Sequence, residues 1–262
     1  MLTLYAVASS ARQMYPCSSA ASARTLSTKR TAFISNNHCK RGKETYVVSK
    51  RRLSSLSAKE SEEEIKQKTT KWINNVVIGL NMCPFAEKTR SQKQLFTTVV
   101  RGDDVEEIIS VVLYESILRK DDAGTTVVIC PELFNDNFLD FYDIVVMAED
   151  VLHDQDMEGI IQIAAFHPLF EFAGSGKDGV DNLTNRSPYP IFHILREEEV
   201  SLAVDKLGGD SGKVWKRNIS LLEAMEETYG REKTETIMSG ENENVEGLKD
   251  LLRSVRLDED SK

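Results

Sequence analysis

Residues 160–197, IIQIAAFHPLFEFAGSGKDGVDNLTNRSPYPIFHILRE, decide the fold because they join two apolar segments through a long irregular loop. Residues 160–166 and 191–197 each have the composition of a buried or half-buried β-strand. The 23 residues between them, 168–190, are rich in Gly, Asp, Asn and Pro and show no helical pattern. A parallel connection needs a crossover, usually a helix, so we expect the second strand to run antiparallel to the first.

The rest of the chain alternates helical and strand patterns. Ser61 and Glu64 form a capping box that predicts the start of a helix, and this helical pattern ends at Cys83. The other helices expected from apolar spacing span 103–121, 135–152, 200–207 and 214–229, and the other strands span 95–100 and 126–130. This order predicts a single α/β domain over residues 60–230, with three parallel strands joined by crossover helices and a fourth, antiparallel strand; an α+β arrangement stays open.

Charge is divided unevenly along the chain. Residues 1–59 contain 11 basic residues and one acid, Glu44, for a charge of +10, whereas the remainder has 22 basic against 41 acidic residues, for −19. A basic, Ser-rich N-terminal segment with almost no acid is typical of an organelle transit peptide. We therefore expect residues 1–59 to be a disordered transit peptide for the mitochondrion, with a plastid as the alternative, and residues 231–262 to form a charged C-terminal tail.

The body of the chain excludes several classes of protein. Nucleic-acid binding needs a basic surface, which a body of charge −19 does not provide. No apolar run approaches the ~18 residues of a membrane span, so we expect a soluble protein. Cys83 and Cys130 are too few for a disulfide framework and show no metal-ligand spacing. The sequence identifies no cofactor.

Polar residues gather where the loop meets the two strands that decide the fold. Ligands of open α/β sheets bind beyond the carboxyl ends of the strands, which selects His167. An antiparallel last strand begins beside His167, so His167, Arg186 and His193 are expected to cluster, with Arg196 roughly 10 Å further along at ~3.3 Å per residue. A guanidinium suits carboxylate or phosphate, and an imidazole transfers protons near neutral pH.

The predicted site has a role for each of these polar residues. We expect His167 and His193 as catalytic residues, Arg186, Asn185, Ser187 and Arg196 as anion-binding residues, and Glu197 and Tyr189 as supporting residues.

Other interpretations of the same residues stay open. Both histidines can be ordinary hydrogen-bonded residues of the sheet, and Arg196 can pair with a neighbouring Glu. The histidines and a carboxylate can also bind a metal, but their 26-residue separation fits no compact motif, and we expect none. Cys83 lies at a helix C-terminus, where the dipole disfavours a thiolate, so we interpret it as a buried apolar residue rather than a nucleophile.

Several short motifs together resemble a known family. They are Trp72-Ile73, GLNMCPFA at 79–86, AFHP at 165–168, Phe172-Ala173-Gly174, NRSPYP at 185–190, HILRE at 193–197 and Lys216-Arg217-Asn218. Over about residues 65–230 the chain resembles domain-of-unknown-function family 1415, found in bacteria, algae and plants. The resemblance implies no activity. It does imply that the polar residues at the strand ends are the family's signature positions.

Two functions of different classes follow from the sequence. The first is an enzyme acting on a small anionic metabolite, with Arg186 binding the anion, His167 or His193 as general acid or base, and Asn185 or Ser187 orienting. The second is a non-catalytic binding or assembly module whose loop 168–190 docks a protein partner. A metal hydrolase is a third, weaker alternative. Neither the substrate nor the partner can be identified from the sequence.

Overall fold

The computed structural model describes residues 60–242 and 245–255, and the predicted transit peptide lies outside this part of the chain. Its centre is a four-stranded sheet in the order β1-β2-β4-β3. The strands are β1 Leu95–Val99, β2 Thr125–Ile129, β3 Ile161–Phe166 and β4 Ile191–Arg196. All four lie where the sequence predicts strands.

The strand directions agree with the sequence in part. β4 is antiparallel to β3, as predicted, and lies between β3 and β2, antiparallel to both. Three parallel strands were expected, but the sheet has one parallel pair, β1 with β2. The connection from β3 to β4 holds a single short 3-10 helix, η3 Val180–Thr184, and no α-helix. Without a crossover helix, β4 returns beside β3 and separates it from β2.

Helices precede and follow the strands much as the sequence predicts. The capping box forms at Ser61 and Glu64 and begins α2 Glu62–Trp72, which continues as a π-helix, η2 Ile73–Ile78. A short helix, α3 Ala86–Ser91, was not predicted. The remaining helices are α4 Val105–Asp121, α5 Phe138–Asp154, α6 Glu197–Asp205, α7 Gly212–Tyr229, α8 Arg231–Met238 and α9 Leu248–Ser254.

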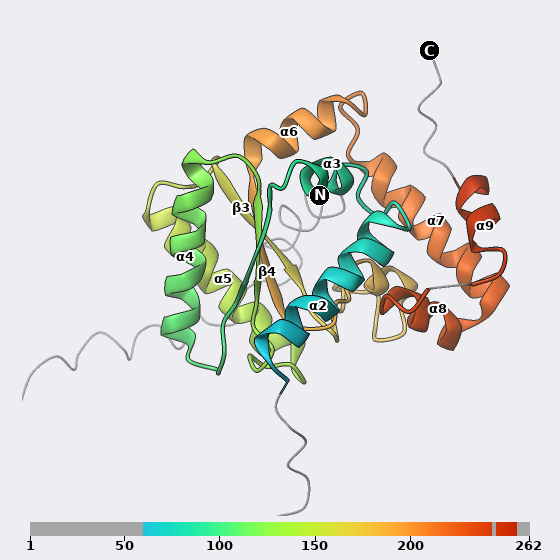
Figure 1. The fold of residues 1–262 in the computed structure, drawn as a ribbon, viewed down its shortest axis with the longest axis horizontal. Helices are drawn as coiled ribbons and strands as arrows, with labels where there is room; N and C mark the ends of the chain where they lie inside the picture. Colours follow the sequence, from blue (N-terminus) through green and yellow to red (C-terminus); the bar gives the residue numbers. More distant parts are fainter. Residues whose placement is uncertain (1–59, 243–244, 256–262) are drawn as a thin grey trace, which may run out of the picture.

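The sheet is buried on both faces, and helices cover each face. Alternate strand residues such as Val127 and Leu195 pack in one cluster with residues of α2, η2 and α7. The residues between them, such as Val128 and Ile194, pack in a second cluster with α4 and α5. Figure 1 shows α4 and α5 together on one side, and α2, α7 and α8 on the other. The molecule is thus a mixed α/β structure with helical layers on both faces of the sheet.

The segment expected as a charged tail contains α8 and α9. Ile237, Met238 and Leu248 are buried in the same cluster as Trp72. The charged residues next to them lie at the surface. The segment therefore has a high average charge although one side of its helices is apolar, which is why the sequence suggested a tail. The part of this segment that the structure describes is therefore packed against the body.

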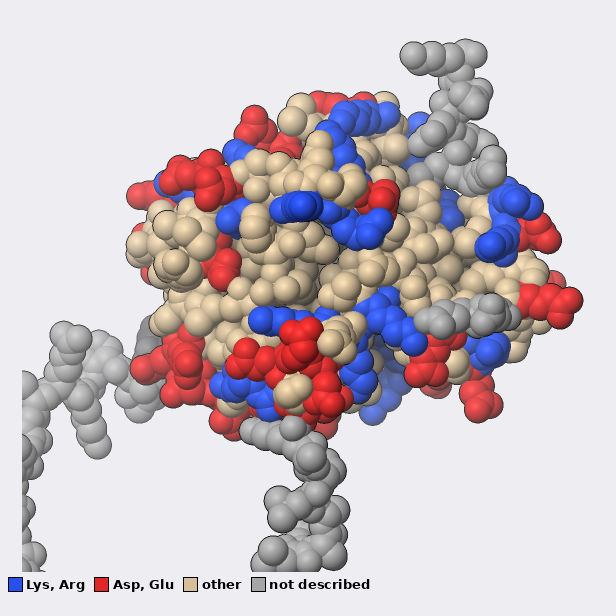
Figure 2. Space-filling view, in the orientation of Figure 1, with Lys and Arg blue, Asp and Glu red and all other residues tan. Residues whose placement is uncertain are grey.

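The described helices include no candidate membrane span, and the face drawn in Figure 2 shows no continuous basic patch. Among the described residues, every helix is too short or too polar to cross a bilayer. On the face in Figure 2, Lys and Arg are interspersed with Asp and Glu around a broad uncharged area.

Candidate functional site

The two predicted catalytic histidines lie on opposite faces of the sheet. The ring of His167 stacks on Phe141, with centroids 5.1 Å apart, and lies 5.6 Å from the ring of Phe138. Both phenylalanines belong to the cluster that contains α5. The ring of His193 lies 6.2 Å from that of Phe166, which belongs to the other cluster. The structure therefore does not form the predicted cluster of His167, Arg186 and His193.

His167 is fully buried, and both of its ring nitrogens are hydrogen-bonded within the protein. Nδ1 accepts the backbone N–H of Leu169 at 3.0 Å, and Nε2 lies 3.0 Å from the carbonyl oxygen of Phe134. Because Nδ1 accepts, Nε2 carries the proton and donates to Phe134. Burial lowers the pKa of His167, which favours this neutral form. These contacts are those of a structural histidine.

Asn185 and Ser187 are also buried and bonded to the backbone. The amide of Asn185 donates to the carbonyl oxygen of Ala165 at 3.2 Å, and the hydroxyl of Ser187 donates to that of Tyr189 at 2.6 Å. The phenol of Tyr189 in turn donates to Glu60 at 2.7 Å, and burial raises the pKa of Tyr189. These bonds fasten the end of loop 168–190 to the sheet and to the start of α2.

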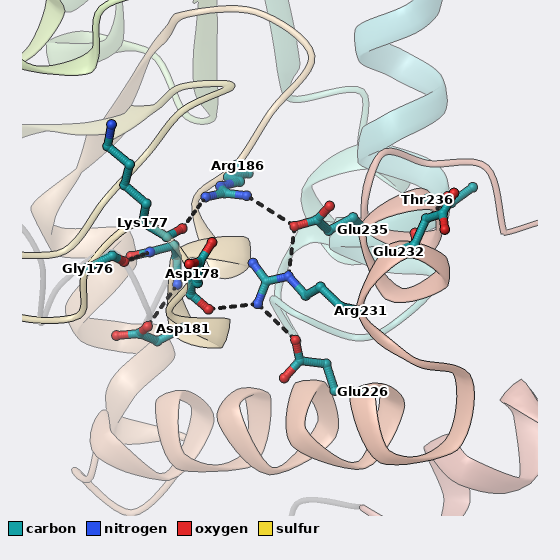
Figure 3. Close-up of polar contacts among 11 residues, drawn as sticks. Gly176, Lys177, Asp178, Asp181, Arg186, Glu226, Arg231, Glu232, Glu235 and Thr236 are labelled. Atoms are coloured by element: carbon teal, nitrogen blue, oxygen red, sulfur yellow. Dashed lines mark hydrogen bonds and ion pairs between the residues drawn. The ribbon is translucent and has the colours of Figure 1, made fainter.

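Arg186 belongs to an ion-pair network between the loop and α8, shown in Figure 3. Its Nη2 donates to the carbonyl oxygen of Lys177 at 2.9 Å, and its Nη1 lies 3.6 Å from Glu235. Glu235 also accepts from Arg231 at 2.7 Å. Burial, and then the charge of Arg231, lower the pKa of Arg186. Two of its nitrogens already have carbonyl and carboxylate partners, which compete with any bound anion, while the buried Nε has no hydrogen-bond partner among the described residues.

Arg196 and Glu197 lie at the other end of β4. Arg196 pairs with Glu198 at 3.1 Å and with Glu199 at 3.3 Å, which is the neighbouring-Glu alternative considered from the sequence. Glu197 begins α6, and burial raises its pKa, with a smaller effect from Glu158. Neither Arg196 nor Glu197 lines the cavity in which His193 lies.

His193 lines a cavity of about 70 Å³ between the sheet and the segment from Trp72 to Ala86. An apolar cavity of about 150 Å³ can hold benzene, which has six non-hydrogen atoms, so this cavity has room for a molecule of roughly three non-hydrogen atoms. The helical side of its wall includes Trp72, Ile73, Val77, Met82, Cys83 and Ala86, and the sheet side includes Thr125, Val127, Phe166 and His193. Most of this lining is apolar.

Thr125 determines which nitrogen of His193 carries a proton. The single proton of the Thr125 hydroxyl is donated to the carbonyl oxygen of Ile194 at 2.5 Å. Nε2 of His193, 2.7 Å from the same hydroxyl oxygen, must then be the donor. Nδ1 is left as an acceptor. Burial lowers the pKa of His193, so the ring is neutral at physiological pH.

Trp72, on the same wall, carries a hydrogen-bond donor that is unpaired among the described residues. Its side chain is 4% exposed and packs edge-on against Phe166, with ring centroids 5.4 Å apart. The buried indole Nε1–H has no hydrogen-bond partner among the described residues. Buried donors are nearly always paired, so this one calls for an explanation such as a water or a bound molecule.

The cavity brings together motifs that carry the family resemblance. Trp72-Ile73, three residues of GLNMCPFA, Phe166 of AFHP and His193 of HILRE all contribute to its wall. Of the predicted site residues, only His193 does so. Sequence reasoning missed Trp72 and Thr125 as site residues. The signal that could have found Trp72 was the shared motif set, because Trp72-Ile73 belongs to that set although it lies far from AFHP and HILRE in sequence.

A comparison with known protein families matches residues 64–232 to the family described as "Protein of unknown function (DUF1415)". The chain therefore belongs to this family, as its motifs indicated. No curated protein and no solved structure matched the chain.

Proposed function

We propose that this protein binds a small, uncharged molecule in the cavity beside His193. The observation that carries the proposal is the convergence of four separated family motifs on one small, mostly apolar cavity that contains a neutral imidazole. Pockets with an apolar wall and a few convergent polar groups are the default sites for small ligands.

Charge on the wall favours an uncharged ligand over the anion expected from the sequence. Among the described residues, no Lys, Arg, Asp or Glu lines the cavity. An ion taken into such a site would lose its hydration without gaining a partner of opposite charge, which is costly. Arg186, the expected anion-binding residue, is instead bonded to Lys177 and Glu235. An enzyme acting on an anionic metabolite therefore has less support than binding of a neutral molecule.

His193 gives the proposed site its chemistry. Its Nδ1 can accept a hydrogen bond from an N–H or O–H group of the ligand. Nε2 stays bonded to Thr125. We assign His193 the role of polar anchor, because burial lowers the pKa of its ring to about 3 and so disfavours uptake of a proton near neutral pH.

A matched pair of probes tests this proposal. Formamide and formate have the same shape, have the size that the cavity accommodates, and differ in charge. We expect 100 mM formamide to raise the Tm of the full-length protein more than formate does, because ligand binding to the folded state stabilises it. His193→Leu should abolish the difference, and Arg186→Gln and the surface control His153→Gln should keep it. A larger effect of formate that depends on Arg186 would restore the anionic ligand.

The binding or assembly module remains the second candidate. Phe134 and Leu169 are 36% and 50% exposed, and both are bonded through their backbones to His167. A protein partner docking on loop 168–190 would use this apolar surface. A co-purifying partner that is lost on Leu169→Asp, together with no response to either probe, would favour this function.

Import of residues 1–59 into mitochondria or plastids is likewise a proposal, tested by fusing them to a fluorescent protein.

A further inference from the structure

The segment from Arg231 to Asn242, which we name the clasp, holds two walls of the cavity from outside. It contains α8 and the turn that follows, and from residue 233 onward it lies beyond the part of the chain matched to the family. One of these walls is the π-helix η2 with Trp72, on the helical side of the cavity, and the other is η3, whose last residue, Thr184, lines the cavity together with the sheet. The clasp has bonds to both.

The first set of bonds joins the clasp to η2. The side-chain amide of Asn75 donates to the carbonyl oxygen of Gly240 at 2.7 Å. The side-chain amide of Asn242 donates back to the carbonyl oxygen of Asn75 at 2.6 Å. Trp72, Ile73 and Val77, on either side of Asn75 in sequence, line the cavity. The clasp thus binds the outer side of the helical segment whose inner side forms the wall.

The turn at Gly240 lies against the backbone of Trp72. Gly240 has φ of 96°, and a Cβ placed on it would be 3.2 Å from the Cα of Trp72. Close contact at a positive φ is the situation that requires glycine. Ile237 and Met238 add buried apolar contact in the cluster that includes Trp72.

The second set of bonds joins the clasp to the loop that carries η3 (Figure 3). Arg231 donates to the carbonyl oxygen of Asp178 at 2.9 Å, and Glu235 lies 3.6 Å from Arg186. Arg186 follows Thr184 of the cavity wall by two residues. Glu235 is 44% exposed, so this half of the clasp is held by ion pairs that solvent and salt weaken.

We infer that the clasp controls access to the cavity: when residues 231–242 detach, the η2 and η3 walls separate and the cavity opens. The two sets of bonds, to η2 and to the loop that carries η3, can each be removed by mutations at residues that do not line the cavity. Local opening of this kind has a lower free energy than global unfolding and can be populated in the folded protein. The inference rests on the proposed function for its biological meaning, since it regulates the same site.

Alkylation of Cys83 by N-ethylmaleimide measures the opening without a ligand. Cys83 lines the cavity and is 6% exposed, so it should react mainly when the cavity opens. Cys130 is fully buried, and burial raises its pKa to about 12, so it should stay unreactive. Peptide mass spectrometry of the full-length protein separates the label on Cys83 from the label on other cysteines.

Two clasp variants and one matched control give the test. We expect Asn242→Ala and Glu235→Gln each to speed labelling of Cys83 by about threefold to tenfold, the effect of losing one hydrogen bond or ion pair on an opening equilibrium. Glu232→Gln removes the same charge from the same helix but breaks no ion pair in the network of Figure 3, so it should leave the rate unchanged.

The outcomes separate the clasp from the proposed ligand. Faster labelling in both clasp variants, with a weaker urea dependence than global unfolding, supports the inference. Equal rates in all four proteins, or acceleration with the full urea dependence of global unfolding, would overturn it. Because the assay contains no ligand, this result is independent of whether formamide binds, and a failure of formamide to bind would count against the proposed function alone.

Discussion

The hydroxyl oxygen of Thr125 lies 2.7 Å from Nε2 of His193, and the same hydroxyl donates a hydrogen bond to the carbonyl oxygen of Ile194. The three groups connect β2 with β4 at the wall of the cavity. The direction of the first bond fixes the tautomer of the imidazole and leaves Nδ1 as an acceptor.

Replacing Thr125 with Val should release the tautomer of His193. In the wild-type protein, long-range ¹H–¹⁵N spectra should show Nε2 protonated and Nδ1 unprotonated. Thr125→Val should give a mixture of tautomers and lower the free energy of unfolding by about 1–3 kcal/mol, because the hydrogen bonds of the hydroxyl with His193 and with the Ile194 carbonyl are both lost. A wild-type spectrum with Nδ1 protonated would contradict this assignment.

Stability should fall as the pH is lowered below about 7. Burial lowers the pKa of both His167 and His193 in the folded state. The unfolded chain therefore binds protons near pH 6.5 that the folded chain does not, which costs up to about 1.4 kcal/mol per pH unit for each histidine. Urea unfolding between pH 7.5 and 5.5 measures the slope. His193→Leu should flatten it, whereas the exposed His153→Gln should not; a flat wild-type profile would refute the prediction.

His167 should prove structural. His167→Ala removes a buried ring from between Phe138 and Phe141 and leaves the Phe134 carbonyl and Leu169 N–H without their partner. We expect a loss of about 2–4 kcal/mol in the free energy of unfolding. At a temperature where the variant is folded, formamide should still bind. Lost binding with an unchanged Tm would instead return His167 to the functional site.

Gly240 should tolerate no side chain. Gly240→Ala combines a positive φ with a contact of 3.2 Å to the backbone of Trp72. Gly102 has a similar φ of 87° but open space around it, so Gly102→Ala serves as a control for backbone strain alone. We expect Gly240→Ala to cost about 1–3 kcal/mol and more than the control, measured by urea unfolding. Equal costs would show that the clasp does not lie tightly on Trp72.

Local patterns predicted the elements of the fold better than their pairing. The capping box at Ser61 and the apolar spacing of residues 105–121 gave helix starts and lengths, because these signals act within a few residues. The lack of a helical pattern in residues 168–190 correctly predicted that β4 runs antiparallel to β3. The insertion of β4 between β2 and β3 is a contact between distant segments, for which no local signal exists.

The candidate site was predicted less well, for a reason visible in the strands. Side chains alternate between faces, and β3 pairs with β4 so that Ala164 lies opposite His193. Residues 164 and 166 then share the face of His193, and His167 belongs to the other. The alternation of side chains along β3, combined with this register, therefore places the two histidines on opposite faces of the sheet. Trp72 joins His193 only through packing of η2 on the sheet, which the sequence does not encode locally.

The central claim, that a small uncharged molecule occupies the cavity at His193, is tested most directly by the imidazole ¹⁵N resonances of His193 during titration of the full-length protein. We predict that formamide shifts the Nδ1 resonance in a saturable manner and that formate does not. A saturable shift with formate alone, or no shift of His193 with either compound, would contradict the claim.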